Sequence, residues 1–230
     1  MNKPRHGRTS GPAPTGISGP GKVRIIGGQW RGTRLDVADV PGLRPTSDRV
    51  RETLFNWLVP MLPGARVLDL FAGSGALGLE AVSRGAGSAV LVEREAVPAA
   101  ALRAIVARLP GGNAVTVIQA DALTWLPPLP DASFDLAFVD PPFAADLWPA
   151  VVAKLLPKLA ADAWLYLESP TQGGLVLPAE WALHREGHTR DVRFAVYRRR
   201  PLANQQAAPA ATLAHDPAGQ RASPFEPASE

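Results

Sequence analysis

The chain of 230 residues contains no cysteine. This absence excludes disulfide bonds, thiolate metal ligands and any enzyme mechanism that needs a cysteine nucleophile. The histidines His6, His184, His188 and His215 form no metal-binding spacing with one another or with acidic residues, so no metal site is predicted.

Long apolar runs are also absent. No segment reaches the roughly 18 to 20 apolar residues that a membrane span needs. Gly, Pro, Ser and Thr follow the basic N-terminus where a secretory signal would need an apolar segment. We therefore expect no membrane association and a cytoplasmic location.

Acidic residues are missing from the first 35 positions, because the first one is Asp36. Clustered positive charge is typical of proteins that bind a polyanion such as nucleic acid, and a solvated basic face is the alternative. The basic residues before Asp36 are Lys3, Arg5, Arg8, Lys22, Arg24, Arg31 and Arg34, and a second group is Arg193, Arg198, Arg199 and Arg200.

The two ends of the chain lack hydrophobic periodicity. Residues 1–22 are rich in Gly, Pro, Ser and Thr and predict a disordered basic arm. Residues 201–230 are rich in Ala, Pro, Gln and Ser and predict a disordered tail. We expect one ordered domain at residues 23–200, and a monomer.

The ordered part predicts an α/β fold. Residues 23–37 predict a β-hairpin around Gly27 and Gly28, and residues 43–60 predict a helix that opens at Pro-Thr-Ser-Asp. In the core at residues 64–200, strands (67–70, 89–92, 115–119, 134–139, 164–168) alternate with helices (77–83, 96–108, 147–160). This alternation predicts a mostly parallel, doubly wound sheet. Segments 181–185 and 192–198 lack an intervening helix and predict a final antiparallel hairpin around Gly187.

The N-terminal hairpin presents an aromatic residue among arginines. Trp30 lies near Arg24, Arg31 and Arg34. Rings stack on bases and guanidinium groups pair with phosphates, so these residues are candidate RNA contacts, and Arg49 is a further one. The alternative is a hairpin that covers the sheet edge with Trp30 in the core.

The stretch GSGALG, from Gly73 to Gly78, fits the dinucleotide pattern G-x-G-x-x-G, with Glu93 about 20 residues beyond its first glycine. Asp69 argues against a dinucleotide, because a carboxylate beside the turn would repel a pyrophosphate. It would attract the ammonium group of S-adenosylmethionine, which has no phosphate. The sequence therefore favours S-adenosylmethionine over NAD.

Two more acids follow the same logic. Glu93 ends the second strand of the core, where its carboxylate can accept hydrogen bonds from ribose hydroxyls, and Asp121 follows the third strand, where it can accept from the adenine amino group. All three acids should lie at the carboxyl edge of the sheet. The full predicted cofactor set is Asp69, Phe71, Gly73, Ser74, Gly75, Glu93, Asp121 and Ala122.

The candidate catalytic motif DPPF follows the fourth strand of the core and contains Asp140, Pro141, Pro142 and Phe143. Two prolines remove backbone donors and leave acceptors. Acceptors suit an exocyclic amino group, because accepting its hydrogens turns the nitrogen lone pair toward the methyl group, and Asp140 stabilises the positive charge that develops there. Phe143 offers a stacking face for a base. Methylation of pyrimidine carbon 5 needs a thiolate, so the absent cysteine favours a nitrogen acceptor.

Four segments together resemble the RsmD family of bacterial methyltransferases over residues 23–200: RIIGGQWRGTRL, LRPTSDRVRETLFNWL, VLDLFAGSGALGLEA and FVDPPF. The resemblance implies a class I (Rossmann-like) fold and methylation of the exocyclic N2 of one guanine in 16S ribosomal RNA, within the small (30S) subunit or a late assembly intermediate. It assigns the cofactor to Asp69, Gly73, Gly75, Glu93 and Asp121, the base to Asp140, Pro141 and Phe143, and the methionine end of the cofactor to the segment 46–49.

Other activities fit parts of the pattern. DPPF chemistry is shared by methyltransferases of DNA adenine-N6 and cytosine-N4. Glutamine methyltransferases typically have Asn where this chain has Asp140. An oxidoreductase would leave DPPF unexplained. A non-catalytic ribosome-assembly factor that binds RNA would not need the complete acidic set.

Overall fold

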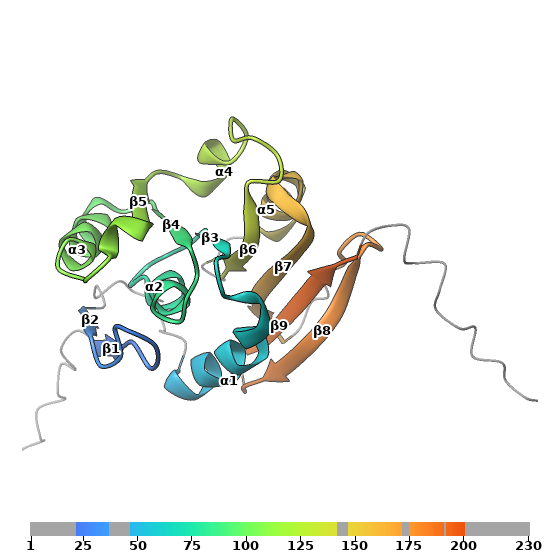
Figure 1. Cartoon of the computed structure of the whole chain (residues 1–230). Helices are drawn as coiled ribbons and strands as arrows, with labels where there is room; N and C mark the ends of the chain where they lie inside the picture. Colours follow the sequence, from blue (N-terminus) through green and yellow to red (C-terminus); the bar gives the residue numbers. More distant parts are fainter. Residues whose placement is uncertain (1–21, 37–46, 142–146, 172–174, 191, 201–230) are drawn as a thin grey trace, which may run out of the picture.

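The computed structural model describes residues 22–36, 47–141, 147–171, 175–190 and 192–200 (Figure 1). The predicted tail at 201–230 and, apart from Lys22, the predicted arm at 1–22 lie outside the described residues. Two predicted catalytic residues, Pro142 and Phe143, also lie outside them.

A seven-stranded sheet forms the centre of the molecule, with strand order β5-β4-β3-β6-β7-β9-β8 (Figure 1). The five strands from β3 to β7 are parallel, and β9 pairs antiparallel with both β7 and β8. The predicted α/β fold with a final antiparallel hairpin is therefore confirmed. The strands are β3 (Arg66–Asp69), β4 (Ser88–Glu93), β5 (Val115–Gln119), β6 (Phe134–Val139), β7 (Leu159–Pro170), β8 (Trp181–His188) and β9 (Val192–Arg199).

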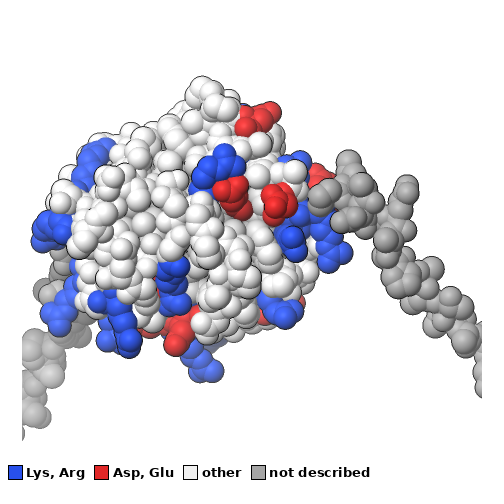
Figure 2. All heavy atoms as spheres, viewed as in Figure 1, with Lys and Arg blue, Asp and Glu red and all other residues white. Residues whose placement is uncertain are grey.

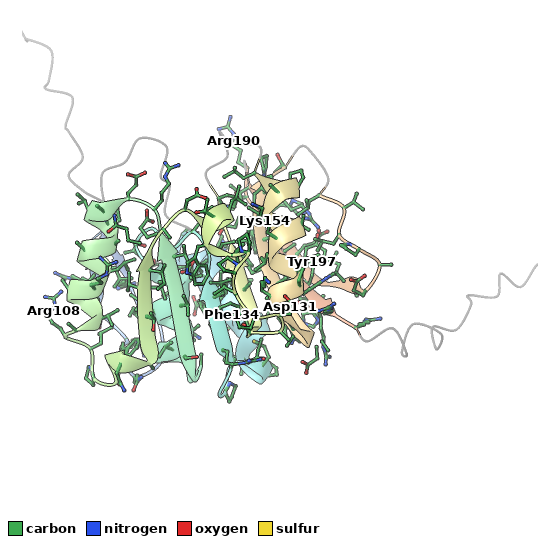
Figure 3. All side chains as sticks on the ribbon, turned by 90° about the horizontal axis from the view of Figure 1, so that it is seen from above. Arg108, Asp131, Phe134, Lys154, Arg190 and Tyr197 are labelled. Carbon is green, nitrogen blue, oxygen red and sulfur yellow. The ribbon has the colours of Figure 1, made fainter. Side chains whose placement is uncertain are left out.

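Helices cover both faces of the sheet, because buried strands present apolar side chains alternately to each side. Leu136 and Phe138 join the core with α1 (Asp48–Leu58), α2 (Ala76–Ser83) and α3 (Ala96–Val106), whereas Ala137 and Val139 join the core with α4 (Ala122–Trp125) and α5 (Trp148–Leu155). Figure 3 shows Lys154 on α5 and Arg108 just past the end of α3. Short 3₁₀ turns are η1 (Val59–Met61), η2 (Gly112–Ala114) and η3 (Leu156–Lys158).

The final hairpin turns later than the sequence predicts. Gly187 lies within β8, and the turn falls after Thr189, whose backbone N–H donates to the Val192 carbonyl at 2.8 Å. Glycine is needed at 187 for a packing reason, because a Cβ atom there would overlap the ring of Phe194 on the neighbouring strand. The expectation of a turn around Gly187 was therefore wrong.

Two helices differ in length from the predicted ones. The predicted helix at 43–60 is seen as α1, which begins after the N-cap residue Ser47 and continues into η1, and residues 43–46 lie outside the described part. The predicted helix at 147–160 ends at Leu155, and η3, which contains Pro157, leads into β7. Proline lacks the N–H that a continuing helix would need.

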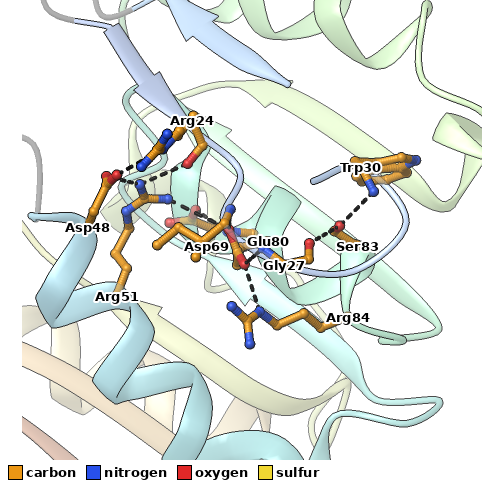
Figure 4. A network of polar contacts seen from close by, with 11 residues as sticks. Arg24, Gly27, Trp30, Asp48, Arg51, Asp69, Glu80, Ser83 and Arg84 are labelled. Carbon is orange, nitrogen blue, oxygen red and sulfur yellow. Dashed lines mark hydrogen bonds and ion pairs between the residues drawn. The ribbon is translucent and has the colours of Figure 1, made fainter. Parts of the chain in front are cut away.

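The N-terminal hairpin, β1 (Lys22–Arg24) with β2 (Arg34–Asp36), is attached to the core through a buried carboxylate on α2 (Figure 4). Glu80 is completely buried and accepts hydrogen bonds from the backbone N–H groups of Ile26 and Gly27, both at 2.7 Å. Arg84 donates to Glu80 at 2.6 Å, and Nη1 of the buried Arg51 lies 3.7 Å from it. We call Glu80, Arg51 and Arg84 the buried ion cluster.

The arginine of α1 extends this attachment to a second helix. Nη2 of Arg51 donates to the Arg24 carbonyl at 2.8 Å and to Asp48 at 2.7 Å (Figure 4). The buried ion cluster therefore joins the hairpin, α1 and α2 in a region where charges are stable only when paired.

Trp30 belongs to the core. Its side chain is 3% exposed and its indole N–H donates to the Pro110 carbonyl at 2.9 Å. Its backbone N–H donates to the Ser83 hydroxyl at 2.9 Å (Figure 4). The prediction that Trp30 stacks on RNA is therefore wrong, because the residue is buried in the core. The alternative interpretation is confirmed for Trp30, which lies in the core, whereas the hairpin attaches to α2 through Glu80 and Ser83 and forms a sheet of its own.

The buried ion cluster predicts a large loss of stability when its carboxylate is removed. Glu80→Ala leaves the buried Arg51 with only Asp48 and the half-buried Arg84 without this anion, and we expect a loss of about 3 kcal/mol in the free energy of unfolding. Urea unfolding monitored by tryptophan fluorescence measures this. Glu52→Ala, at an exposed position of α1, is the matched control and should change stability by about 0.5 kcal/mol or less. Equal stability of the two variants would contradict the prediction.

Candidate cofactor and base site

Four acidic residues meet at the carboxyl edge of the sheet. They are Glu93 at the end of β4, Asp69 at the end of β3, Asp140 directly after β6, and Glu168 near the end of β7. These strands are neighbours in the order β4-β3-β6-β7. By strand alternation all four lie on the face covered by α1, α2 and α3. We call these residues the acid row. It brings Asp69 on the neighbouring strand, and Glu93 one strand further, to the same edge as the predicted catalytic aspartate.

Asp69 is held inside the protein by the glycine loop. It is 3% exposed and accepts a hydrogen bond from the Gly78 backbone N–H at 2.9 Å. A Cβ atom at Gly78 would lie 3.1 Å from the Asp69 Cβ, so glycine lets α2 approach the strand end. Burial, assisted by the negative charge of Glu93 and opposed by the Gly78 hydrogen bond, raises the pKa of Asp69 to about 7.

The loop between β3 and α2 adopts a conformation that needs glycine. Gly75 has a φ of 73°, and a Cβ there would lie 2.5 Å from the Leu102 side chain. The Glu93 carboxylate accepts the backbone N–H of Gly73 at 2.9 Å and that of Glu95 at 2.8 Å. Glu93 therefore positions the loop, and its contact with a ribose stays a prediction. The predicted cofactor residues Phe71 and Ser74 are half-buried in the same loop.

Asp121 lies after β5, one strand beyond Glu93. One oxygen of its exposed carboxylate accepts the backbone N–H groups of Leu123 at 3.0 Å and Thr124 at 3.1 Å. It is the N-cap of α4, a short helix that the sequence analysis did not predict. The adjacent Ala122 is buried. Contact of this pair with adenine remains a prediction.

Asp140 is half-buried and Pro141 is buried. Burial raises the pKa of Asp140 well above its ordinary value, and the negative charges of Glu168 and then Asp69 add to this effect. A carboxyl group of this kind is a better hydrogen-bond acceptor and a stronger base than a solvated aspartate. Perturbed acids at a sheet edge are typical of functional sites.

The sequence analysis missed Glu168 and Tyr166 on β7. The Tyr166 hydroxyl donates to Glu168 Oε1 at 2.6 Å, and both side chains are buried. Glu168 could have been found by the rule that identified Asp69 and Glu93, because it is an acid near the end of an apolar parallel strand. It lies in the segment LYLES, which is not part of the four segments that resemble the RsmD family.

The remaining RNA candidates lie on the surface. Arg24, Arg31, Arg34 and Arg49 are all exposed, and Arg24 makes an ion pair with Asp48 at 3.2 Å. In Figure 2 basic side chains are spread over the side of the molecule that carries β1, β2 and α3. The hairpin arginines predicted from the sequence as RNA contacts are therefore accessible, whereas Trp30 is buried.

The acid row fits S-adenosylmethionine better than a dinucleotide, because a pyrophosphate would meet the carboxylates of Asp69 and Glu93. Among the described residues, no group of three or more His, Asp or Glu side chains is arranged to hold a metal ion. No helix in the described ranges has both the length and the apolar content to cross a membrane.

The comparisons with known proteins agree with this geometry. The family model "Conserved hypothetical protein 95" matches residues 23–198. The chain is 46% identical over 202 residues to the ribosomal RNA small subunit methyltransferase D of Escherichia coli, covering 86% of this chain and 96% of that protein. It is 39% identical over 181 residues to the protein of the same name in Haemophilus influenzae, covering 77% and 94%.

A solved Escherichia coli structure, assigned provisionally as the methyltransferase yhhF, superposes with a TM-score of 0.70 at 45% identity and covers 79% of this chain and 99% of its own. The family match spans the hairpin, the glycine loop, the acid row and Asp140 together. The chain therefore belongs to the Conserved hypothetical protein 95 family, the RsmD family that its motifs resemble, and it is a methyltransferase.

Proposed function

We propose that this protein transfers the methyl group of S-adenosylmethionine to the exocyclic N2 of a specific guanine in 16S ribosomal RNA, within the 30S subunit or a late assembly intermediate. The observation that carries the proposal is the position of Asp140-Pro141 beside Asp69 on the neighbouring strand. The names of the curated relatives support a ribosomal RNA substrate. A ribosomal substrate also agrees with the cytoplasmic location expected from the sequence.

S-adenosylmethionine supplies an electrophilic methyl group on a sulfonium. In the proposed site Asp69 would hold its ammonium end, the loop at Gly73 and Gly75 would lie against it, and Glu93 would bind the ribose hydroxyls. Asp121 and Ala122 would hold the adenine. In this arrangement each hydrogen-bond donor of the cofactor meets an acceptor of the protein. Asp140 is left for the base that receives the methyl group.

Asp140 would act on the amino nitrogen. Its carboxylate accepts a hydrogen of the amino group, which turns the nitrogen lone pair away from the ring and toward the methyl group. Its negative charge stabilises the positive charge that develops on nitrogen, and burial strengthens this effect because the local dielectric is low. Pro141 removes a backbone donor beside the carboxylate. Pro142 and Phe143 would complete the pocket for the base.

The exposed arginines of the hairpin and of α1 would contact the RNA backbone. Arg24, Arg31 and Arg34 lie on one small element that is fixed to α2 by Glu80, and Arg49 lies in the first turn of α1. Fixed arginines can position an RNA relative to the acid row, because the same buried ion cluster holds both elements.

Replacing Asp140 tests the proposed function directly. In cells that lack this protein, mass spectrometry of 16S ribosomal RNA should show one lost N2-methylguanine, and the wild-type gene should restore it. Asp140→Asn should lower the transfer rate at least about 100-fold, because an amide neither carries the charge nor accepts equally well. Its affinity for S-adenosylmethionine should stay within a few-fold by calorimetry. An unchanged methylation pattern in the deletion strain would refute the proposal.

The raised pKa of Asp69 predicts pH-dependent cofactor binding. Below about pH 7 the carboxyl group is protonated and loses its attraction for the ammonium group. As the pH increases from 5, the affinity for S-adenosylmethionine should therefore rise by up to about tenfold per pH unit and level off near pH 7. Calorimetry from pH 5 to 7.5 measures this while the cofactor amine stays protonated. Asp69→Asn should bind weakly with a flat profile. If the variant kept the wild-type slope, another group would be responsible.

Neutralising the hairpin arginines predicts a weaker salt dependence of RNA binding. The triple variant Arg24→Gln, Arg31→Gln, Arg34→Gln should reduce the slope of log K against log salt by about 2 to 3, if each residue neutralises one phosphate. Fluorescence anisotropy with a 16S fragment measures the slope. Arg108→Gln, an exposed residue just beyond α3, is the control and should leave it almost unchanged. If the triple variant kept the wild-type slope, the hairpin would only cover the core and would not bind RNA.

A further inference from the structure

A β-bulge in β8 decides which face of the sheet one arginine occupies. Leu183 pairs with Tyr197 of β9 and Arg185 pairs with Val196, so His184 is the extra residue of the bulge. Residues directly opposite each other in an antiparallel pair extend to the same face, and Val196 belongs to the core on the face that α1, α2 and α3 cover. Without the bulge Arg185 would extend to the other face, because side chains alternate along a strand. The bulge therefore turns this arginine to the face of α1.

An aromatic and basic cluster forms on that face. Trp164 of β7 packs against the core there and pairs with Arg198 of β9, whose Cζ lies 5.3 Å from the centre of the Trp164 ring. The ring of His184 contacts Trp164 edge to face, with centroids 4.8 Å apart. Nη1 of Arg185 donates to the His184 carbonyl at 3.2 Å. We call Trp164, His184, Arg185 and Arg198 the bulge cluster.

No carboxylate balances the positive charge of the bulge cluster within the parts of the chain that the structure describes. Neither arginine is in an ion pair there, and the side chain of Arg198 makes no hydrogen bond. Glu186 follows Arg185 and extends to the opposite face, where Arg193 donates to it at 2.7 Å. Burial, and then the charges of Arg185 and Arg198, lower the pKa of His184, so its ring is neutral at pH 7 and the two arginines carry the charge.

The two arginines are accessible and held in place. Arg185 and Arg198 are exposed, whereas Trp164 and His184 are half-buried. A guanidinium group that stacks on a ring uses its flat face and keeps its N–H groups available in its own plane. These N–H groups match two oxygens of a phosphate, which arginine binds through parallel hydrogen bonds. Because the ring already restrains the side chain, binding orders it at a lower entropic cost.

The bulge cluster lies away from the acid row. Trp164 pairs with Leu136 near the start of β6, whereas Val139 at the end of β6 pairs with Leu167. Glu168 of the acid row therefore lies roughly 13 Å further along β7, at about 3.3 Å per residue. An anion at the bulge cluster belongs to a different part of a long ligand than the group that enters the acid row.

We propose that the bulge cluster is a second RNA contact, in which Arg185 and Arg198 bind phosphates of 16S ribosomal RNA away from the methylated nucleotide and Trp164 holds Arg198 in position. RNA is favoured over an acidic protein, because the planar guanidinium groups match phosphate oxygens and the RNA supplies many of them. This inference rests on the proposed function, because it takes ribosomal RNA as the partner.

The double variant Arg185→Gln, Arg198→Gln tests this contact in the full chain. Loss of two phosphate contacts should reduce the slope of log K against log salt by about 1.5 and raise Kd for protein-free 16S RNA about tenfold at physiological salt. Filter binding over a range of salt concentrations measures both. The matched control Arg103→Gln, Arg108→Gln removes the same charge from exposed positions in and just beyond α3, and its slope should stay close to that of the wild type.

Methyl transfer to 30S particles gives a second measurement. KM should rise about tenfold in the double variant while kcat stays within about twofold, because the bulge cluster does not touch the acid row. Arg198→Lys keeps the charge, so it should keep most of the salt slope and lose only part of the affinity. Arg185→Gln alone leaves the contact of Arg198 with Trp164 intact and should lower the slope by about half as much as the double variant. Thermal unfolding verifies that each variant folds.

The outcomes separate this inference from the function on which it rests. A double variant with the wild-type salt slope and KM overturns the RNA contact and leaves the proposed function intact. An equal change in the α3 control reduces the effect to net charge and also overturns it. Weaker binding to 30S particles with normal binding to protein-free RNA assigns the bulge cluster to a ribosomal protein instead. A wild-type enzyme that methylates no guanine overturns the proposed function, and the binding measurements still test the bulge cluster.

Discussion

The buried carboxylate of Glu80 is the interaction on which the arrangement of this protein depends. It accepts backbone hydrogen bonds from the N-terminal hairpin and pairs with Arg51 of α1 and Arg84 of α2. Nε and Nη1 of Arg51 have no hydrogen-bond partner among the described residues, so Glu80 is the nearby anion that compensates Nη1, at 3.7 Å. Buried charges tolerate little displacement, because separating them leaves each one unpaired in a low dielectric. The hairpin and both helices are therefore held in one geometry.

Helix α2 connects the buried ion cluster to the candidate site. Glu80 lies two residues after Gly78, whose backbone N–H holds Asp69, and α2 begins directly after the glycine loop. The N-terminal hairpin, whose exposed face is basic, is thus attached to α2, the helix that follows the glycine loop. Parallel strands then place acids from distant parts of the chain at one edge, where burial and mutual repulsion raise the pKa values of Asp69 and Asp140.

The acid row explains why the glycine pattern misleads when it is considered alone. A G-x-G-x-x-G turn only provides close approach to the backbone, and the charge beside it selects the cofactor. Here the turn is flanked by Asp69 and Glu93, which suit an ammonium group and ribose hydroxyls.

The sequence by itself determined the alternation of strands and helices, the glycine loop, and the acids Asp69, Glu93 and Asp140, because these depend on local periodicity and on the chemistry of short motifs. It could not place Trp30, whose neighbours Ser83 and Pro110 are more than 50 residues away, and it placed the last turn at Gly187 because the need for glycine came from Phe194 on another strand. Glu168 was hidden for the same reason. Only the parallel register of β6 and β7 brings it beside Asp140, and that register depends on which side chains the two strands bury together in the folded protein.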